Sequence, residues 1–178
     1  MPVAASTYHA SDGAAYEVFL GRWTKELAPH LLDFAELPSQ GALLDVGTGT
    51  GSLAHAMAAR WPSRHILGID VAEPYIAYAR ERTTGPLPEF AIGDAAALRH
   101  DDGKFAGAAA QLVLNFVPDP LAAVCEMRRV TRCGGTVVAA VWDFRGGLVY
   151  QRLFWDSAAG LDRGRCARPA VLWAARSS

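Results

Sequence analysis

The sequence is poor in the features that mark several classes of protein. Its 178 residues include three cysteines that form no Cys-x-x-Cys pair, and five histidines without the spacing of metal ligands. These patterns argue against a disulfide framework and a zinc site, and they are typical of a reducing compartment. We therefore expect a cytoplasmic protein without a metal centre.

The chain also has little net charge and no long apolar run. The formal net charge is −1, and lysine occurs only at Lys25 and Lys104. Nothing in this balance favours nucleic acid or an anionic membrane surface as a partner. No apolar run approaches the roughly 18–20 residues of a membrane span, and the first residues carry no signal-peptide pattern. With 51% apolar residues, the chain suits one domain with its own core.

The sequence does contain a regular alternation of short apolar runs and helical patterns. Strands are predicted at 43–46, 66–69, 90–92, 105–113 and 136–142. Helices are predicted at 16–35, 53–61, 73–82, 120–130 and 151–159, and Gly134–Gly135 is predicted as a turn. The strands are apolar on both faces, as parallel strands covered by helices on both sides are. We predict an α/β fold with a doubly wound, mostly parallel sheet that binds ligands at its carboxyl edge.

The glycine-rich stretch 43–51 is the strongest functional signal. A buried strand carrying Asp45 runs directly into three alternating glycines, which are Gly47, Gly49 and Gly51. Glycine lets a ligand approach the backbone closely, and the acid can accept hydrogen bonds from hydroxyls or a cationic group. A dinucleotide fingerprint requires glycine where Ser52 stands, and a P-loop requires Gly-Lys-Ser/Thr, which is absent. A tight turn without a ligand remains the alternative.

Further polar residues follow the next strands. Asp70 ends the second strand, where its two oxygens suit two ribose hydroxyls; the alternative is a helix cap. Asp94 ends the third strand and is a candidate acceptor for an adenine amino group, with the Ala95 N–H donating to a ring nitrogen; the alternative is an N-cap. Gln111 and Leu112 end the fourth strand, where they either line a cofactor or pack in the core.

Aromatic residues lie on both sides of this predicted site. Candidates for a lid or an acceptor pocket are Tyr16, Phe19, Arg22, Trp23, Trp142 and Phe144. The alternative is that the aromatic face of the 16–35 helix packs that helix onto the core. No general base is assigned; Tyr8, His9 and His100 are candidates, and surface or capping roles are the alternative for each.

Four motifs in order carry a family resemblance. They are LLDVGTGTGSLA, LGIDVAEPYIAYAR, FAIGDAAAL and the segment from LVLNFVPDP to VVAAVWDF, with YEVFLGRW upstream. Residues 16–162 resemble the class I S-adenosylmethionine (SAM)-dependent methyltransferases of the small-molecule type, in the ubiquinone/menaquinone-biosynthesis-like group. The resemblance implies SAM as cofactor and a small-molecule acceptor.

The resemblance also implies roles for individual residues. Asp45 and the three glycines would hold the methionine part of SAM, Asp70 with Val71 the ribose, and Asp94 with Ala95 the adenine. Aromatic faces near the cationic sulfur would add about 0.5–2 kcal/mol of attraction. Two alternatives stay open: a SAM-binding protein that has lost catalysis, and an NAD(P)-binding oxidoreductase.

The resemblance divides the chain into three parts. These are an N-terminal helical lid at 1–41, a SAM-binding α/β core at 42–162, and an Arg/Ala-rich tail at 163–178 that does not match the family. From this we expect a methyltransferase shortened at its C-terminus, without the last two strands of the family sheet. The 136–142 strand would then be an exposed edge, which predicts a homo-oligomer through this edge or the helix after it.

Overall fold

The computed structural model describes residues 12–144 and 146–161, which fall into two compact units separated at the Val141–Trp142 bond. The helical segments are α1 (Gly13–Tyr16), η1 (Glu17–Gly21), α2 (Arg22–Phe34), α3 (Ser52–Arg60), α4 (Glu73–Glu81), α5 (Pro120–Val130) and α6 (Val149–Leu161). The strands are β1 (Leu43–Val46), β2 (Ile66–Asp70), β3 (Glu89–Ile92), β4 (Phe105–Gln111) and β5 (Thr131–Ala140). All elements but α6 belong to the first unit.

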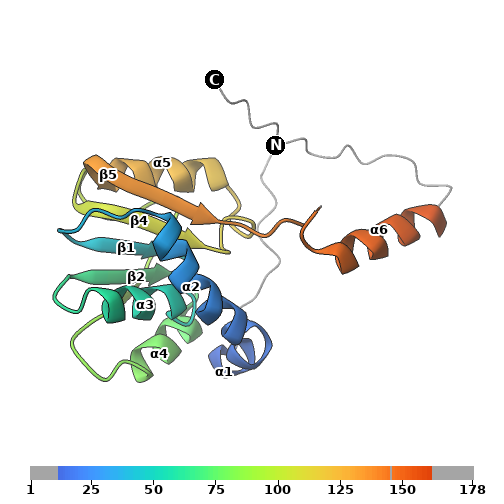
Figure 1. The fold of residues 1–178 in the computed structure, drawn as a ribbon, viewed down its shortest axis with the longest axis horizontal. Coiled ribbons are helices and arrows are strands. Elements are labelled where there is room, and N and C mark those ends of the chain that lie inside the picture. Colours follow the sequence, from blue (N-terminus) through green and yellow to red (C-terminus); the bar gives the residue numbers. More distant parts are fainter. Residues whose placement is uncertain (1–11, 145, 162–178) are drawn as a thin grey trace. The chain divides into compact units, whose positions relative to one another are not determined.

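The five strands form one parallel sheet in the order β3-β2-β1-β4-β5 (Figure 1). The central strand β1 pairs with β2 on one side and β4 on the other. The chain therefore builds the sheet outward in one direction and then in the other, as predicted for a doubly wound fold. The switch point, where such folds bind ligands, lies between β1 and β4 at their carboxyl ends.

Helices cover both faces of the sheet. Leu43 belongs to a buried cluster with residues of α2, α3 and α4, whereas its neighbour Leu44 belongs to a second cluster with residues of α5 (Figure 1). Successive strand residues face opposite sides, and both sides are buried. Two apolar cores thus fix the strand ends that follow, including the glycine turn after β1.

The N-terminal segment differs from the single helix predicted over 16–35. It forms α1, a π-helical turn η1 and then α2, whose buried residues are Thr24, Ala28, Leu31 and Leu32. Phe19 and Trp23 are 77% and 51% exposed, so the alternative, that they pack the helix onto the core, does not hold for these two residues. A π-helical turn holds extra backbone per turn and rotates the residues after it. The buried face of α2 is thus formed by threonine, alanine and leucine and not by the aromatic residues.

Strand β5 also differs from its prediction. It begins at Thr131 and includes Gly134–Gly135, which the sequence predicts as a turn. Its register on β4 shifts between Phe105 and Gly107, and Gly134 adopts φ +73°. The glycines thus form a bulge within the strand. Among the described residues, no strand pairs with the outer edge of β5.

The second unit contains α6, which is longer than the predicted 151–159 helix. A turn precedes it, in which the Asp143 carboxylate accepts the N–H groups of Gly146 and Gly147 at 2.8 and 2.9 Å. Trp142 and Phe144 belong to this unit, and their acceptor role stays a prediction. The tail at 163–178 lies outside the described residues. None of the described helices is both long and apolar enough to cross a membrane.

Candidate active site

Asp45 sits at the carboxyl end of β1 and is 1% exposed. Its Oδ2 accepts the Thr48 hydroxyl at 2.7 Å and the Ala54 N–H, in the first turn of α3, at 3.0 Å. Its Oδ1 is buried and has no hydrogen-bond partner. Burial raises the pKa of Asp45 to about 7, against the two hydrogen bonds, which lower it. A buried acceptor of this kind is a candidate partner for a donor from a ligand.

A side chain at each of the three glycines of the turn would have different surroundings. All three have positive φ, between +55° and +87°. A Cβ on Gly47 would lie 2.3 Å from the Val113 side chain, and one on Gly51 would lie 2.8 Å from Phe90. A Cβ on Gly49 would meet no atom within 4 Å. Gly47 and Gly51 therefore serve packing, and Gly49 borders open space that a ligand can occupy.

Asp70 ties the end of β2 to this turn. Its Oδ2 accepts the Gly49 N–H at 2.8 Å and its Oδ1 accepts the Ala72 N–H at 2.9 Å. Burial raises the pKa of Asp70, although hydrogen bonds from backbone N–H groups lower it in part. Asp70 does not cap α4, whose N-cap residue Ala72 receives no side-chain cap hydrogen bond. The ligand role stays a prediction, and each carboxylate oxygen can accept a second hydrogen bond.

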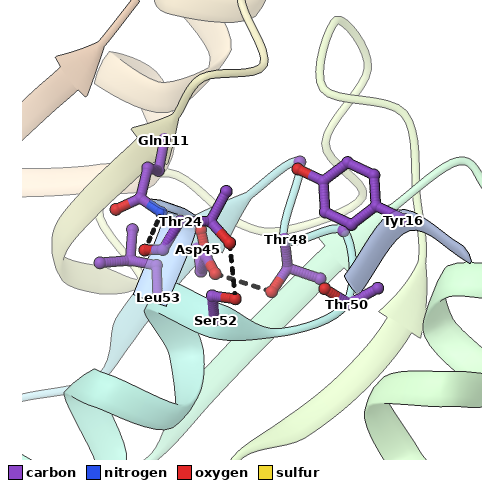
Figure 2. A pocket seen from close by; sticks show the side chains of 10 residues that line it. Tyr16, Thr24, Asp45, Thr48, Thr50, Ser52, Leu53 and Gln111 are labelled. Atoms are coloured by element: carbon purple, nitrogen blue, oxygen red, sulfur yellow. Dashed lines mark hydrogen bonds between the residues drawn. The ribbon is translucent and has the colours of Figure 1, made fainter. Parts of the chain in front are cut away.

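A pocket opens where the turn meets the N-terminal helices (Figure 2). Its lining residues are Tyr16, Thr24, Asp45, Gly47, Thr48, Gly49, Thr50, Ser52, Leu53 and Gln111. The hollow measures about 30 Å³, which suits a terminal polar group of a ligand and not a whole nucleoside. Of the predicted lid residues, Tyr16 lines it, whereas Phe19 and Trp23 do not.

Gln111 and Thr24 close one side of this pocket. The Gln111 amide donates to the Thr24 carbonyl at 2.9 Å, and the Thr24 hydroxyl lies 3.0 Å from that of Ser52 (Figure 2). The Gln111 Oε1 is buried without a hydrogen-bond partner. Ser52, where a dinucleotide fingerprint would have glycine, thus contacts α2. Two residues that line the pocket, Asp45 and Gln111, thus each have one buried acceptor without a donor.

Leu112 follows with φ +59°, and its N–H donates to the Ala140 carbonyl at 2.7 Å. A left-handed leucine costs on the order of 1 kcal/mol and often marks a functional edge. It directs the chain away from the sheet directly after Gln111. Its predicted contact with a cofactor stays a prediction, because it is not among the lining residues of the pocket.

The ends of β2 and β3 form an apolar surface next to Asp70. Asp70 pairs with Ile92 across these strands, and Ile92 and Val71 are both exposed. Asp94 follows at the end of β3; its Oδ1 accepts the Ala96 N–H at 2.9 Å, and the Ala95 side chain is buried. The alternative role, a cap of the turn at 95–98, is therefore present. Ile92, which sequence inspection missed, extends the surface that a base can cover.

Sequence inspection also missed the hydroxyl groups of the pocket. Thr48 and Thr50 stand between the glycines, a Gly-Thr-Gly-Thr-Gly pattern that could have pointed to them. Thr24 carries no such signal, because α2 brings it to the site from a distant segment. Among the candidate bases, His100 packs edge-on against Phe105 at the amino end of β4, away from the pocket. Tyr8 and His9 lie outside the described residues.

The comparison with protein families decides the class of this site. A family profile described as "Methyltransferase domain" matches residues 44–139, more than half of the chain. The chain belongs to this methyltransferase family. The match starts on β1 and ends on β5, so it includes the glycine turn, Asp70 and Gln111. The predicted resemblance to class I methyltransferases is confirmed.

Relatives of this methyltransferase domain include two demethylmenaquinone methyltransferases. That of Roseiflexus castenholzii is 39% identical over 100 residues, which are 56% of this chain and 42% of the relative. That of Thermus thermophilus is 33% identical over 141 residues, 75% of this chain and 61% of the relative. The chain thus spans about half the length of these two relatives.

A solved structure confirms the predicted fold. It is the putative methyltransferase in a complex with the Trm112 methyltransferase activator of Haloferax volcanii. The TM-score is 0.67 at 19% identity, over 84% of this chain and 68% of that chain. At this identity the likeness concerns the fold alone.

The family implies SAM as cofactor, and the residues of this methyltransferase domain fit it. SAM ends in an ammonium and a carboxylate, and the ammonium supplies donors of the kind that Asp45 Oδ1 and Gln111 Oε1 lack. The open space beside Gly49 leaves room for a ligand at the backbone. The exposed Val71 and Ile92 offer apolar surface to a base.

Proposed function

We propose that the chain binds SAM at the carboxyl edge of the sheet and transfers its methyl group to a small-molecule acceptor. The observation that carries the proposal is the pair of buried acceptors without donors, Asp45 Oδ1 and Gln111 Oε1, in one pocket beside the glycine turn. Buried oxygen acceptors without donors, in residues that line a pocket, favour a ligand with an ammonium group.

Different residues would hold different parts of the cofactor. Asp45, Gln111 and the turn at Gly49 would hold its methionine end. Asp70 would accept the ribose hydroxyls, with Val71 beside it. Asp94 and the Ala95 N–H, next to the exposed Ile92, would contact the adenine. Support comes from the position of all these residues on consecutive strand ends of one sheet.

When bound, SAM supplies an electrophilic methyl group on a cationic sulfur. The residues of this chain would then act mainly by position. The turn and the pocket hold the cofactor in one orientation, and the N-terminal helices exclude water from it. No side chain is assigned as a general base. Phe19 of η1 and, at the start of α2, Arg22 and Trp23 are proposed acceptor contacts.

The acceptor class is proposed from the relatives. Two of them are named for demethylmenaquinone and one for 2-methyl-6-phytyl-1,4-hydroquinone, so a hydroquinone ring is our first choice. The test is incubation with methyl-labelled SAM and a panel of hydroquinones, followed by extraction of labelled product. Label in a hydroquinone supports the proposal.

The alternative is a protein that binds SAM without turnover. It makes a distinct prediction, namely tight binding of S-adenosylhomocysteine with no labelled product from any acceptor of the panel. Such a result would overturn methyl transfer to hydroquinones and leave cofactor binding in place.

We further propose that β5 pairs with the β5 of a second copy. The support is its outer edge, which no described strand covers, and the exposed Val137 and Val141 beside it. Light scattering should give at least a dimer, and substitution of Val137 by lysine should dissociate it. A monomeric wild type would contradict this proposal. Free thiols at the exposed Cys125 and Cys133 support a reducing, cytoplasmic compartment.

A further inference from the structure

The carboxylate of Glu17 lies between the N-terminal helices and the glycine turn. Its Oε1 accepts the Thr50 hydroxyl at 2.6 Å, and its Oε2 forms an ion pair with Lys25. Arg82 Nη1 lies 3.1 Å from Oε1, although its N–H is not aligned for a hydrogen bond. The Glu17 side chain is only 9% exposed. A carboxylate this buried is stabilised only with such partners around it.

Residues 13–21, which we call the lid, rest on α4 beside this carboxylate. A Cβ on Gly13 would lie 2.6 Å from the Tyr78 side chain, so the lid backbone closely approaches that helix. The Tyr16 and Tyr75 rings lie 5.1 Å apart. Tyr16 also lines the pocket beside the glycine turn. The segment that carries Glu17 therefore covers the place where the cofactor is proposed to bind.

Gly21 provides the space into which the Glu17 side chain folds. A Cβ on Gly21 would lie 2.6 Å from Glu17 Oε2, and all of its nearest neighbours belong to Glu17. Gly21 has ordinary helical backbone angles, with φ −56° and ψ −38°. This backbone conformation does not require glycine, and glycine is otherwise unfavourable inside a helix. Gly21 leaves room for the Glu17 carboxylate, which a Cβ would displace.

We propose that Glu17 is a positioning residue that fastens the lid to Thr50 and Arg82 and so sets how fast the cofactor leaves the pocket. The inference rests on the proposed function. Thr50 belongs to the glycine turn and Arg82 follows α4, so one carboxylate joins the lid to two elements of the cofactor site. Release of a ligand held behind Tyr16 requires these contacts to break.

Two substitutions test the contacts in different ways. Glu17→Gln keeps an acceptor for Thr50 but removes the charge that pairs with Arg82 and Lys25. Gly21→Ala keeps the charge but places a methyl group where the carboxylate lies. The control is Asp33→Asn. It removes the exposed ion pair between Asp33 of α2 and Arg60.

The measurement is the dissociation rate of S-adenosylhomocysteine after rapid dilution, together with the free energy of unfolding. We expect both test variants to release it about tenfold faster than the wild type, and Asp33→Asn to match the wild type. Alanine has a higher helix propensity than glycine. Gly21→Ala should therefore not lose stability in proportion to its faster release of the ligand. A purely structural role would make the release rate follow stability in all variants.

Hydrogen exchange of the lid amides in the ligand-free protein separates this proposal from the proposed function. Faster exchange in both test variants shows that Glu17 fastens the lid. If the wild type binds S-adenosylhomocysteine and neither release nor exchange changes, the role of Glu17 is wrong and the proposed function stands. If the wild type does not bind it, the proposed function and the control of release both fail, and exchange still decides whether Glu17 holds the lid.

Discussion

Asp45 caps helix α3 from inside the sheet, because its Oδ2 accepts the Ala54 N–H at 3.0 Å. The first turn of a helix favours negative charge, yet burial outweighs this and raises the pKa of Asp45 to about 7. One oxygen accepts a hydrogen bond from the helix, and the other is buried without a hydrogen-bond partner. We therefore expect this carboxyl group to link the stability of α3 to the charge of the proposed ligand.

Ligand binding should depend on pH through Asp45. An ammonium group pairs with the ionised carboxylate, so binding should become tighter as pH rises through about 7. Titration calorimetry with S-adenosylhomocysteine between about pH 6 and pH 8 measures this, with at most a tenfold change in affinity per pH unit. Asp45→Asn should bind weakly at every pH. A pH-independent affinity in the wild type would contradict the role of Asp45.

The stability of the ligand-free protein should fall as pH rises, whereas the affinity for the ligand should increase. The pKa of Asp45 is 3.8 in the unfolded state and about 7 in the folded state. Between these pH values the folded state therefore binds more protons. Relative to Asp45→Asn, the wild type should therefore lose stability as pH rises from about 4 to 7, by about 4 kcal/mol at most. Urea unfolding of both proteins at several pH values gives the difference, and parallel curves would refute it.

Substitution of Gly49 and of Gly47 by alanine should have different effects on stability and ligand binding. Both have positive φ, which costs an alanine about 1–2 kcal/mol. Gly49→Ala adds a methyl group in open space, so it should fold with little further loss but bind S-adenosylhomocysteine at least about tenfold more weakly. Gly47→Ala collides with Val113 and should lose more stability. Thermal unfolding and calorimetry measure both, and unchanged binding by Gly49→Ala would place the ligand elsewhere.

Adenosine separates the two ends of the proposed site. It lacks the ammonium group, so Asp45→Asn should leave adenosine binding nearly unchanged. Asp70→Asn should weaken it about tenfold or more, because an amide offers one acceptor oxygen where a carboxylate offers two. Competition against a fluorescent adenosine analogue provides the measurement. Equal losses in both variants would show that the two acids do not hold separate parts of the ligand.

Part of this site was predictable because its signals are local. Asp45, the glycines and Asp70 stand at strand ends that apolar runs reveal, and parallel strands bring their ends together at one edge. Glu17 and Thr24 were not predictable in this way. They reach the site only because η1 and α2 pack across it, which depends on tertiary contacts.

Two errors have similar local causes. The apolar spacing predicts one regular helix over 16–35, and the π-helical turn that interrupts it has no recognised sequence signature. Gly134–Gly135 resembles a turn, but β4 continues to pair beyond it, so the pair forms a bulge. In both cases packing of the neighbouring element decides the outcome.

The most direct test of the central claim is calorimetric titration of the purified chain with S-adenosylhomocysteine, with NAD as the comparison. The account predicts saturable binding of S-adenosylhomocysteine, to a first approximation in the micromolar range, and none of NAD. Binding of neither by a folded protein, or binding of NAD alone, would contradict a cofactor site built on Asp45, Asp70 and Gln111.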